Sequence, residues 1–414
     1  MQRLYDTAVY EIHRLSNGIP VYVNRPPIQL DEEIKISVVL KNIGSCADPK
    51  EWPGLAHFFE HMTFDGTKSY PSPELLVVPI EKEGGRVGAN TSKARTVFYL
   101  KILWQDVGLF IDRIFEIIAH PKFTQENIDR EKSVIEQEYF RYHKNPDYVL
   151  RSALDSLLYN GHPFSHNIIG TLESIRSITK NELWLYHSKY YHAGNIAIVC
   201  AGSVLDPQKL IALLDGFFGA MKTKDSAHIA PVPSLPTKTF PVENPDFGRD
   251  RACYIYSLPR SSIQEQFAFN SLAKFISGSK YSPLLRELRI KKGWVYESGL
   301  VNMIKGIDQD IVEVAFPVKR KNFDEAYQIF LDILSSINKG EYEEYAAKQK
   351  KIRRTCFQHP LDTSDSVIQS ILRDEKHLSH REREAISNSI TLENILICRD
   401  IILSSKPFIF KALI

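Results

Sequence analysis

The stretch of sequence best suited to chemistry is Pro53–Thr67, PGLAHFFEHMTFDGT, which places two histidines and a glutamate among phenylalanines. His57 and His61 are four residues apart, so in a helix both imidazoles lie on one face and could bind the same metal ion. Glu60 lies about 100° around the helix from His61, because a helix turns once per 3.6 residues. It is poorly placed as a third ligand, but it could act as the general base on a water at the metal.

The order HxxEH is the inverse of the HExxH motif of zinc hydrolases, which makes a zinc site the first hypothesis. A chance match to so short a motif in a chain of 414 residues has a probability of roughly 2%. The alternative is a pair of core histidines that hydrogen-bond to backbone groups. Catalytic zinc usually has three protein ligands and an open position for water, so a third ligand must come from another segment.

The candidates for this third ligand lie in the acid-rich segment Thr124–His143, which is predicted to be a helix. Glu131 and Glu138 are two helical turns apart and would share a face. Glu136 is a competitor. Periodicity does not choose among the three, and a solvated helix face is the alternative explanation for each acid.

Two further pairs of histidines are less suitable ligands. His162 and His166 are four residues apart, but Pro163 and the neighbouring turn residues argue against a helix that would align them. We predict a loop there. His187 and His192 are five residues apart, so they do not share a helix face, and structural roles are predicted for both.

The elements that must position these residues are strands and helices. Short β-branched runs bounded by turn residues predict strands at Ile34–Gly44 and Asn195–Val204. Amphipathic stretches between them predict helices, among others at Leu109–His120 and Asn145–Tyr159. Because strands and helices do not alternate strictly, the predicted fold class is α+β.

A proline-rich segment divides the chain into halves of similar length. Residues 222–250 carry five prolines without a helical or alternating period, which is typical of an extended linker. Since 414 residues are too many for one comfortable core, we predict an N-terminal catalytic domain at 1–222, a linker at 223–248 and a C-terminal domain at 249–414.

The second half repeats the first in outline, because Gly66–Ala89 can be aligned with Gly278–Gly299 through a shared Gly, Lys, Tyr and Ser-Pro and a leucine-rich helix. The counterpart of the HxxEH motif would fall within Phe267–Gly278, which contains no histidine and no glutamate. The repeat therefore predicts one metal site per chain, in the first half.

Composition excludes some partners. Lys plus Arg (52) nearly cancels Asp plus Glu (50), so the formal net charge of +2 gives no field that would recruit nucleic acid or an anionic membrane. The N-terminus has no apolar signal region and no run reaches the length of a membrane span. The chain has five widely spaced cysteines without a CxxC pair, which suits a reducing compartment, and we expect a cytoplasmic protein.

Over nearly its whole length, the chain resembles the M16 family of zinc metallopeptidases. The resemblance rests on GLAHFFEHMTFDGTKSY together with NGIPVYV, IGSCADP, GGRVGANTSKARTVFYL, read as a strand, and REKSVIEQEYF. It implies that Glu138 is the third ligand and that Glu131 orients a ligand. It also implies one zinc ion per chain, and a His/His/Glu set favours zinc over manganese or cobalt.

The resemblance also implies substrate contacts. Arg289 and Tyr296 match an Arg and a Tyr that face the zinc in the family, where the Tyr assists at the tetrahedral intermediate and the Arg holds a substrate carbonyl. An exposed edge strand is implied to bind an extended peptide through main-chain hydrogen bonds. The residues expected to do so are Gly88, Ala89, Asn90 and Thr91.

The predicted protein is a zinc-dependent endopeptidase for short or unfolded peptides. The resemblance implies two homologous α/β-sandwich domains of the LuxS/MPP-like type, each with a mostly antiparallel sheet, that form half of a clamshell. A homodimer would enclose the chamber, with a heterodimer of related subunits as the alternative. The other functions considered are a non-catalytic or partner-dependent subunit and a processing peptidase for targeting sequences.

Overall fold

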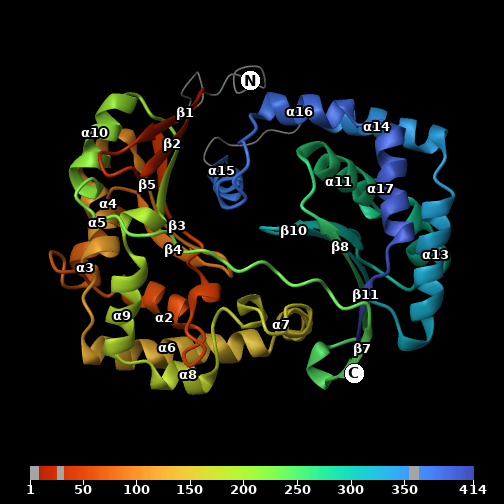
Figure 1. Cartoon of the computed structure of the whole chain (residues 1–414), viewed down its shortest axis with the longest axis horizontal. Helices are drawn as coiled ribbons and strands as arrows, with labels where there is room; N and C mark the ends of the chain where they lie inside the picture. Colours follow the sequence, from red (N-terminus) through yellow and green to blue (C-terminus); the bar gives the residue numbers. More distant parts are fainter. Residues whose placement is uncertain (1–8, 26–31, 354–362) are drawn as a thin grey trace. The chain divides into compact units, whose positions relative to one another are not determined.

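The computed structural model describes residues 9–25, 32–353 and 363–414 (Figure 1). The chain forms two compact units, each built around one sheet. The first unit comprises Met1–Tyr142, Asn160–Ala230 and Phe357–Ser379, and the second comprises His143–Tyr159, Pro231–Cys356 and His380–Ile414. The predicted α+β class with two domains is confirmed.

The sheet of the first unit has six strands in the order β1-β2-β6-β3-β5-β4. All neighbouring strands are antiparallel except β2 and β6, which are parallel. The apolar strands β3 and β6 lie at its centre, where both faces are covered, and β6 is buried throughout. The bounds are β1 Val9–Arg14, β2 Pro20–Arg25, β3 Glu33–Lys41, β4 Arg86–Thr91, β5 Arg95–Leu103 and β6 Ile196–Gly202.

Helices of the first unit supply the residues of the predicted site. The HxxEH motif lies in α2 (Leu55–Met62), and the acidic segment forms α6 (Gln125–His143), as predicted. The other helices of this unit are α3 Pro73–Leu76, α4 Val78–Lys82, α5 Val107–Ala119, α8 Leu172–Ser177, α9 Lys180–Tyr190, α10 Pro207–Phe218 and α15 Thr363–Leu372.

Among the residues that the structure describes, the second sheet repeats the first without a counterpart of β1. Its order is β7-β11-β8-β10-β9, and its one parallel pair, β7 with β11, corresponds to β2 with β6. This shared arrangement supports the duplication inferred from sequence. The bounds are β7 Thr239–Glu243, β8 Arg251–Pro259, β9 Val301–Lys305, β10 Gln309–Phe316 and β11 Phe408–Leu413.

A large apolar core of the second unit lies between its sheet and several of its helices, among them α11 (Ile263–Ser277). Helix α11 carries many apolar residues and no histidine, so it has no counterpart of the histidine pair in α2. The remaining helices are α7 Pro146–Leu158, α12 Pro283–Leu285, the π-helical turn η6 Arg286–Lys291, α13 Phe323–Ser335, α14 Lys339–Arg353, α16 His380–Ser389 and α17 Leu392–Ser404.

The two units do not follow the expected linear domain boundaries, because each takes a helix from the other half of the sequence. Helix α7 was expected in the N-terminal domain, but Leu150, Leu154 and Leu158 pack against the sheet of the second unit. Helix α15 was expected in the C-terminal domain, but Val367 and Ile368 pack against the sheet of the first. A single boundary in the sequence cannot describe these two units, because both helices pack against apolar residues that lie far away in the sequence.

The predicted linker 223–248 is extended only in its first part. Residues 222–238 form neither helix nor strand, but Thr239–Glu243 forms β7, which pairs with β11 at the edge of the second sheet. Pro241 lies within this strand. A proline is tolerated on an edge strand because its missing N–H can face away from the ladder.

Among the described residues, no helix combines the length and the apolar composition that a membrane crossing requires.

Candidate metal centre

Helix α2 presents its polar residues on one face because the remaining positions are buried. Its apolar residues, among them Phe58 and Phe59, enter the core, and Phe59 packs on Tyr191 with ring centroids 4.4 Å apart. Burial of such a side chain contributes about 1.5–3 kcal/mol. This packing fixes the orientation of the helix about its own axis. His57, Glu60 and His61 remain at least partly accessible.

The start of α2 is fixed by Asp48, a residue that sequence reasoning missed. Its carboxylate accepts hydrogen bonds of 2.7 Å from the backbone N–H groups of Gly54 and Ala56. These are first-turn N–H groups that have no partner inside the helix. Asp48 lies six residues before Gly54 and so outside the usual capping position. Only the folded loop brings it there, and no local sequence signal indicates it.

The structure brings His57, His61 and Glu138 together, as predicted. One potential ligand atom from each residue lies within 4.8 Å of the others. Oε2 of Glu138 is 3.7 Å from Nε2 of His57 and 3.5 Å from Nε2 of His61. Bonds of about 2 Å to a tetrahedral zinc ion place ligand atoms about 3 to 4 Å apart, so these two separations suit a shared ion.

Two neighbouring charges hold the ligands in place. Oε2 of Glu131, which is 9% exposed, lies 3.2 Å from Nδ1 of His61. A hydrogen bond donated by Nδ1–H leaves Nε2 as the free nitrogen that faces Glu138. Arg141 donates a 2.8 Å hydrogen bond to Oε1 of Glu138, which leaves Oε2 for the histidines.

The donor set fits a zinc ion. Two imidazoles and one carboxylate from two helices are ligands that zinc accepts, and three protein ligands leave a position for water. Among the described residues, Nδ1 of His57 is buried without a hydrogen-bond partner. By contrast, His162 and His187, both outside the cluster, bond through Nε2 to the backbone oxygens of Ala230 and Ile118.

Burial and neighbouring charges shift the pKa values of all three residues of the cluster. Burial, together with neighbouring His61, lowers the pKa of His57 to about 4. Burial also opposes the charged form of His61, but hydrogen bonds with Glu131 and Glu138 outweigh it and raise its pKa to about 9. The hydrogen bond with His61 lowers the pKa of Glu138 despite its burial. Without a metal, His57 is therefore neutral and Glu138 is ionised, whereas His61 must release the proton on Nε2 before that nitrogen can bind a metal.

Glu60 lies beside the cluster and contacts the edge strand. Its Oε2 accepts a 2.6 Å hydrogen bond from Oγ1 of Thr91, which is 7% exposed. Burial raises the pKa of Glu60, which makes its carboxylate a stronger base. The hydrogen bond from Thr91 opposes this shift and fixes the direction of the carboxylate.

The segment expected to bind substrate is an edge strand, as predicted. Strand β4 contains Gly88, Ala89, Asn90 and Thr91. Within the described parts of the chain it pairs only with β5 and ends the sheet. The stretch 84–100, read as one strand, instead forms the hairpin β4–β5, which turns at residues 92–94. A side chain at Gly88 would meet the Tyr99 hydroxyl at 2.7 Å, so this glycine permits close cross-strand packing.

The other candidate metal ligands lie outside the cluster of His57, His61 and Glu138. Glu136 pairs with Arg176 at 2.9 Å and is not in the cluster. His162 and His166 flank a 3-10 turn at Pro163–Ser165, so the predicted loop is confirmed.

Arg289 and Tyr296 lie in the second unit, whereas the metal cluster lies in the first. Arg289 is in η6, and its guanidinium lies 4.6 Å from the centre of the Tyr296 ring. Tyr296 itself is in a loop and 82% exposed. The two predicted substrate-binding groups are thus neighbours of each other, and both are accessible enough to contact a ligand.

A helix that carries HxxEH, a glutamate from a second helix and an adjacent glutamate base form the type of site found in zinc hydrolases. The family models agree. Residues 31–172 match the model described as Insulinase (Peptidase family M16), and residues 177–351 match the one described as Peptidase M16 inactive domain. The chain belongs to peptidase family M16. The second match covers most of the repeat that lacks the motif.

Relatives carry names of the same kind. A protein of Rickettsia felis named an uncharacterized zinc protease is 26% identical over 294 residues, which is 71% of this chain and 70% of the relative. Protease 3 of Escherichia coli is 25% identical over 382 residues, 87% of this chain but only 38% of the longer relative. Among solved structures, a protease from Helicobacter pylori has a TM-score of 0.83 at 18% identity and covers 98% of this chain and 99% of its own. That structure supports the fold alone.

Proposed function

We propose that this chain is a zinc-dependent endopeptidase that hydrolyses short or unfolded peptides. The observation that carries the proposal is the convergence of His57, His61 and Glu138 beside the buried base Glu60. When bound, zinc would supply Lewis acidity, which lowers the pKa of a water and polarises a scissile carbonyl. The names of the relatives support a zinc protease.

In this proposal the chain's own groups move the protons. Glu60 takes a proton from the attacking water at its free carboxylate oxygen, because Oε2 is already bonded to Thr91. The same carboxyl then gives the proton to the leaving amine. Glu131 keeps His61 in the tautomer that presents Nε2, and Arg141 holds the second oxygen of Glu138.

The edge strand would bind the substrate. A peptide that adds to β4 as a further strand would make main-chain hydrogen bonds along Gly88, Ala89, Asn90 and Thr91. Because Thr91 also contacts Glu60, the bound peptide would pass directly beside the base. This geometry favours unfolded substrates, since a folded segment has no free strand to offer.

We further propose that Arg289 and Tyr296 bind a substrate carbonyl and stabilise the developing oxyanion, and that two copies of the chain enclose the reaction chamber. The support is that the pair is accessible and that the chain spans 38% of Protease 3. Sedimentation at micromolar concentration tests the dimer, which a purely monomeric species would contradict.

The cytosol is the proposed compartment. Cys46, Cys200, Cys253 and Cys398 are all free thiols, which is consistent with a reducing environment, while Cys356 lies outside the described residues.

The test of the metal site combines metal analysis with peptide hydrolysis. Purified protein is stripped with a chelator, reloaded with zinc and assayed on a quenched, unstructured peptide. We expect one zinc per chain, activity only after reloading, and loss of both in His57→Ala and Glu138→Gln. Glu136→Gln, on the same helix, is the matched control and should retain both. Hydrolysis that persists without metal would refute the proposal, whereas zinc binding without hydrolysis would favour a non-catalytic M16 subunit.

A further inference from the structure

Arg130 lies on α6 and connects this helix to the end of α2, so it joins the two helices that carry the metal-binding residues. All three nitrogens of its guanidinium have a partner. Nη1 donates a 3.2 Å hydrogen bond to Oδ1 of Asn127, Nη2 donates to Oδ1 of Asp65, and Nε lies 3.6 Å from Oε1 of Glu131. Although the side chain is 49% exposed, these contacts fix its direction.

The three residues Asp65, Arg130 and Glu131 form a carboxylate bridge between the helices. Asp65 is buried in the turn that follows α2, and Glu131 is buried on α6. Through its other oxygen, Oε2, Glu131 lies 3.2 Å from Nδ1 of His61. The contacts therefore leave the end of α2, cross to α6 and return to α2, and Figure 1 shows these two helices side by side.

The two carboxylates of the bridge are close enough to repel each other. Burial, and after it the charge of Glu131, raises the pKa of Asp65 to about 6, while Arg130 acts in the opposite direction. A cation between two acids replaces their repulsion by two attractions. A guanidinium suits this position, because its planar fork donates in several directions, whereas an ammonium group is a compact point charge.

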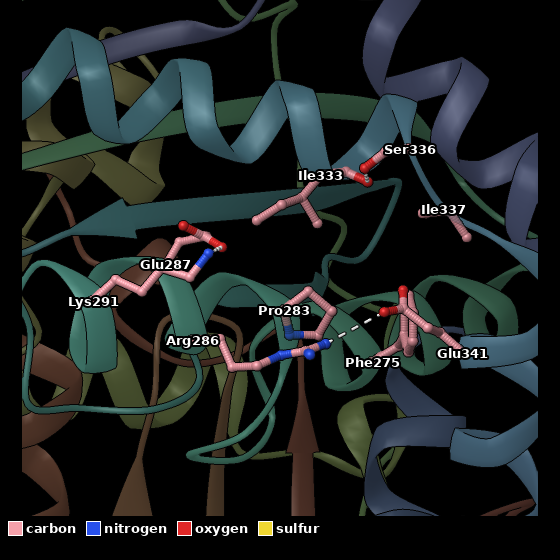
Figure 2. A pocket seen from close by; sticks show the side chains of 9 residues that line it. All are labelled: Phe275, Pro283, Arg286, Glu287, Lys291, Ile333, Ser336, Ile337 and Glu341. Carbon is pink, nitrogen blue, oxygen red and sulfur yellow. Dashed lines mark hydrogen bonds and ion pairs between the residues drawn. The ribbon is translucent and has the colours of Figure 1, made fainter.

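Two ion pairs of the second unit provide a contrast. Beside a cavity of about 240 Å³, Arg286 pairs with Glu341 at 3.5 Å (Figure 2), and Lys291 pairs with Glu287 at 2.6 Å. Such exposed contacts between one cation and one acid usually contribute little. Arg130 is as exposed as Arg286, yet it joins two buried carboxylates, one of which supports a metal-binding histidine.

We propose that Arg130 is a positioning residue of the metal centre, which holds Glu131 against His61 and so keeps Nε2 of His61 directed at the ion. The residue acts through Glu131 and not on the ion itself. This inference rests on the proposed zinc site, but it does not depend on peptide hydrolysis.

Charge alone and positioning predict opposite effects for the loss of Arg130. Removing a positive charge near a cation site raises the affinity for the cation, if nothing else changes. Releasing Glu131 from its fixed direction lowers this affinity, because His61 loses its support. A fall in zinc affinity therefore reports the positioning role.

The test is the zinc affinity of the full-length chain, measured by competition with a chelating dye. We expect Arg130→Gln to weaken zinc binding by about three- to tenfold, which is less than the roughly 10- to 100-fold typical of a group that contacts a ligand directly. Arg130→Lys keeps the charge but not the fork, and it should recover only part of this loss. Lys132→Gln removes the same charge one residue further along α6 and should leave the affinity unchanged or slightly raised.

A double-mutant cycle separates positioning from general support of the fold. If Arg130 acts through Glu131, Arg130→Gln causes no further loss of zinc affinity in a chain that already carries Glu131→Gln. An equal loss in both backgrounds would assign Arg130 a structural role and overturn the proposal. Since Arg130 is half exposed, its variants should fold, and urea unfolding of the zinc-free proteins checks this.

Failure of this inference differs from failure of the proposed function. Unchanged or raised affinity in Arg130→Gln, beside a wild type that binds zinc, would overturn the positioning role alone. A wild type that binds no zinc would refute the metal site and the positioning role together.

Discussion

At the level of single residues, His61 differs from His57 in having a carboxylate behind its ring. Oε2 of Glu131 lies 3.2 Å from Nδ1 of His61, whereas Nδ1 of His57 has no partner among the described residues. The two imidazoles are therefore oriented by different kinds of contact. His61 is fixed by a hydrogen bond, whereas His57 is held by packing within α2 and would be fixed further by a bound metal ion.

Glu131→Gln is predicted to weaken zinc binding without abolishing it. The amide can still contact Nδ1 but no longer stabilises its proton electrostatically, and changes in such supporting groups typically cost about 10- to 100-fold in metal affinity. Competition with a chelating dye measures the effect. Glu136→Gln is the control on the same helix, since Glu136 pairs with Arg176. Equal losses in the two variants would contradict the assigned role.

Thr91→Val is predicted to lower kcat by about tenfold with zinc content unchanged. The substitution keeps the shape of the side chain but removes the 2.6 Å hydrogen bond to Glu60, whose carboxylate then loses its fixed direction. Thr91→Ser keeps the hydroxyl and should restore most of the rate. A rise in KM at constant kcat would instead assign Thr91 to substrate binding alone.

At the level of elements, α2 depends on a loop that precedes it. Asp48→Asn replaces one of the acceptors at the helix start with a donor that faces a backbone N–H. We expect the free energy of unfolding to fall by about 1–2 kcal/mol, together with a lower zinc affinity because the helix start loosens.

Urea unfolding and dye competition measure these two effects. The control is Asp206→Ala, because Asp206 caps α10, which carries no ligand, and alanine removes the capping oxygen. That variant should lose stability with unaltered zinc affinity. An unchanged zinc affinity in Asp48→Asn would show that the cap is not coupled to the site.

The contact between α9 and α2 predicts a pH dependence of stability. His187 stacks on Phe59 and bonds to the Ile118 oxygen, and burial lowers its pKa from the usual 6.5. Below pH about 6.5 the unfolded chain takes up a proton there that the folded chain does not. The stability that the neutral ring of His187 contributes to the folded chain is therefore lost as the pH falls through and below 6.5.

Urea unfolding at pH 7.5 and 5.5 should give a smaller decrease in His187→Gln, which keeps a donor for Ile118, than in the wild type. An equal decrease in the free energy of unfolding in both proteins would contradict the prediction, because it would show that His187 does not contribute to the pH dependence.

At the scale of the whole molecule, local patterns predicted more than long-range ones. The helical face of His57 and His61 and the strands β3 and β6 follow from the order of apolar residues. Choosing Glu138 over Glu136 required the resemblance to the family, because spacing on a helix cannot say which face meets α2. The structure supports that choice through the shared position of the ligand atoms.

Features that depend on distant partners were not predictable from the chain alone. Helices α7 and α15 each pack on the sheet of the other half, and β7 forms only because β11, far along the sequence, lies beside it. The same applies to Asp48 and to the bond between Thr91 and Glu60, which loop and sheet geometry create. The periodicity of apolar residues reports local structure and does not indicate which distant segments come into contact.

The most direct test of the central claim is hydrolysis of a quenched, unstructured peptide by the zinc-loaded wild type beside zinc-loaded Glu60→Gln. The base contributes typically about 10²- to 10⁴-fold to such a rate. We therefore predict that the variant binds zinc normally and loses at least about 100-fold in kcat. Retention of wild-type kcat by Glu60→Gln, with zinc bound in both proteins, would contradict the assignment of Glu60 as the base and the mechanism built on it.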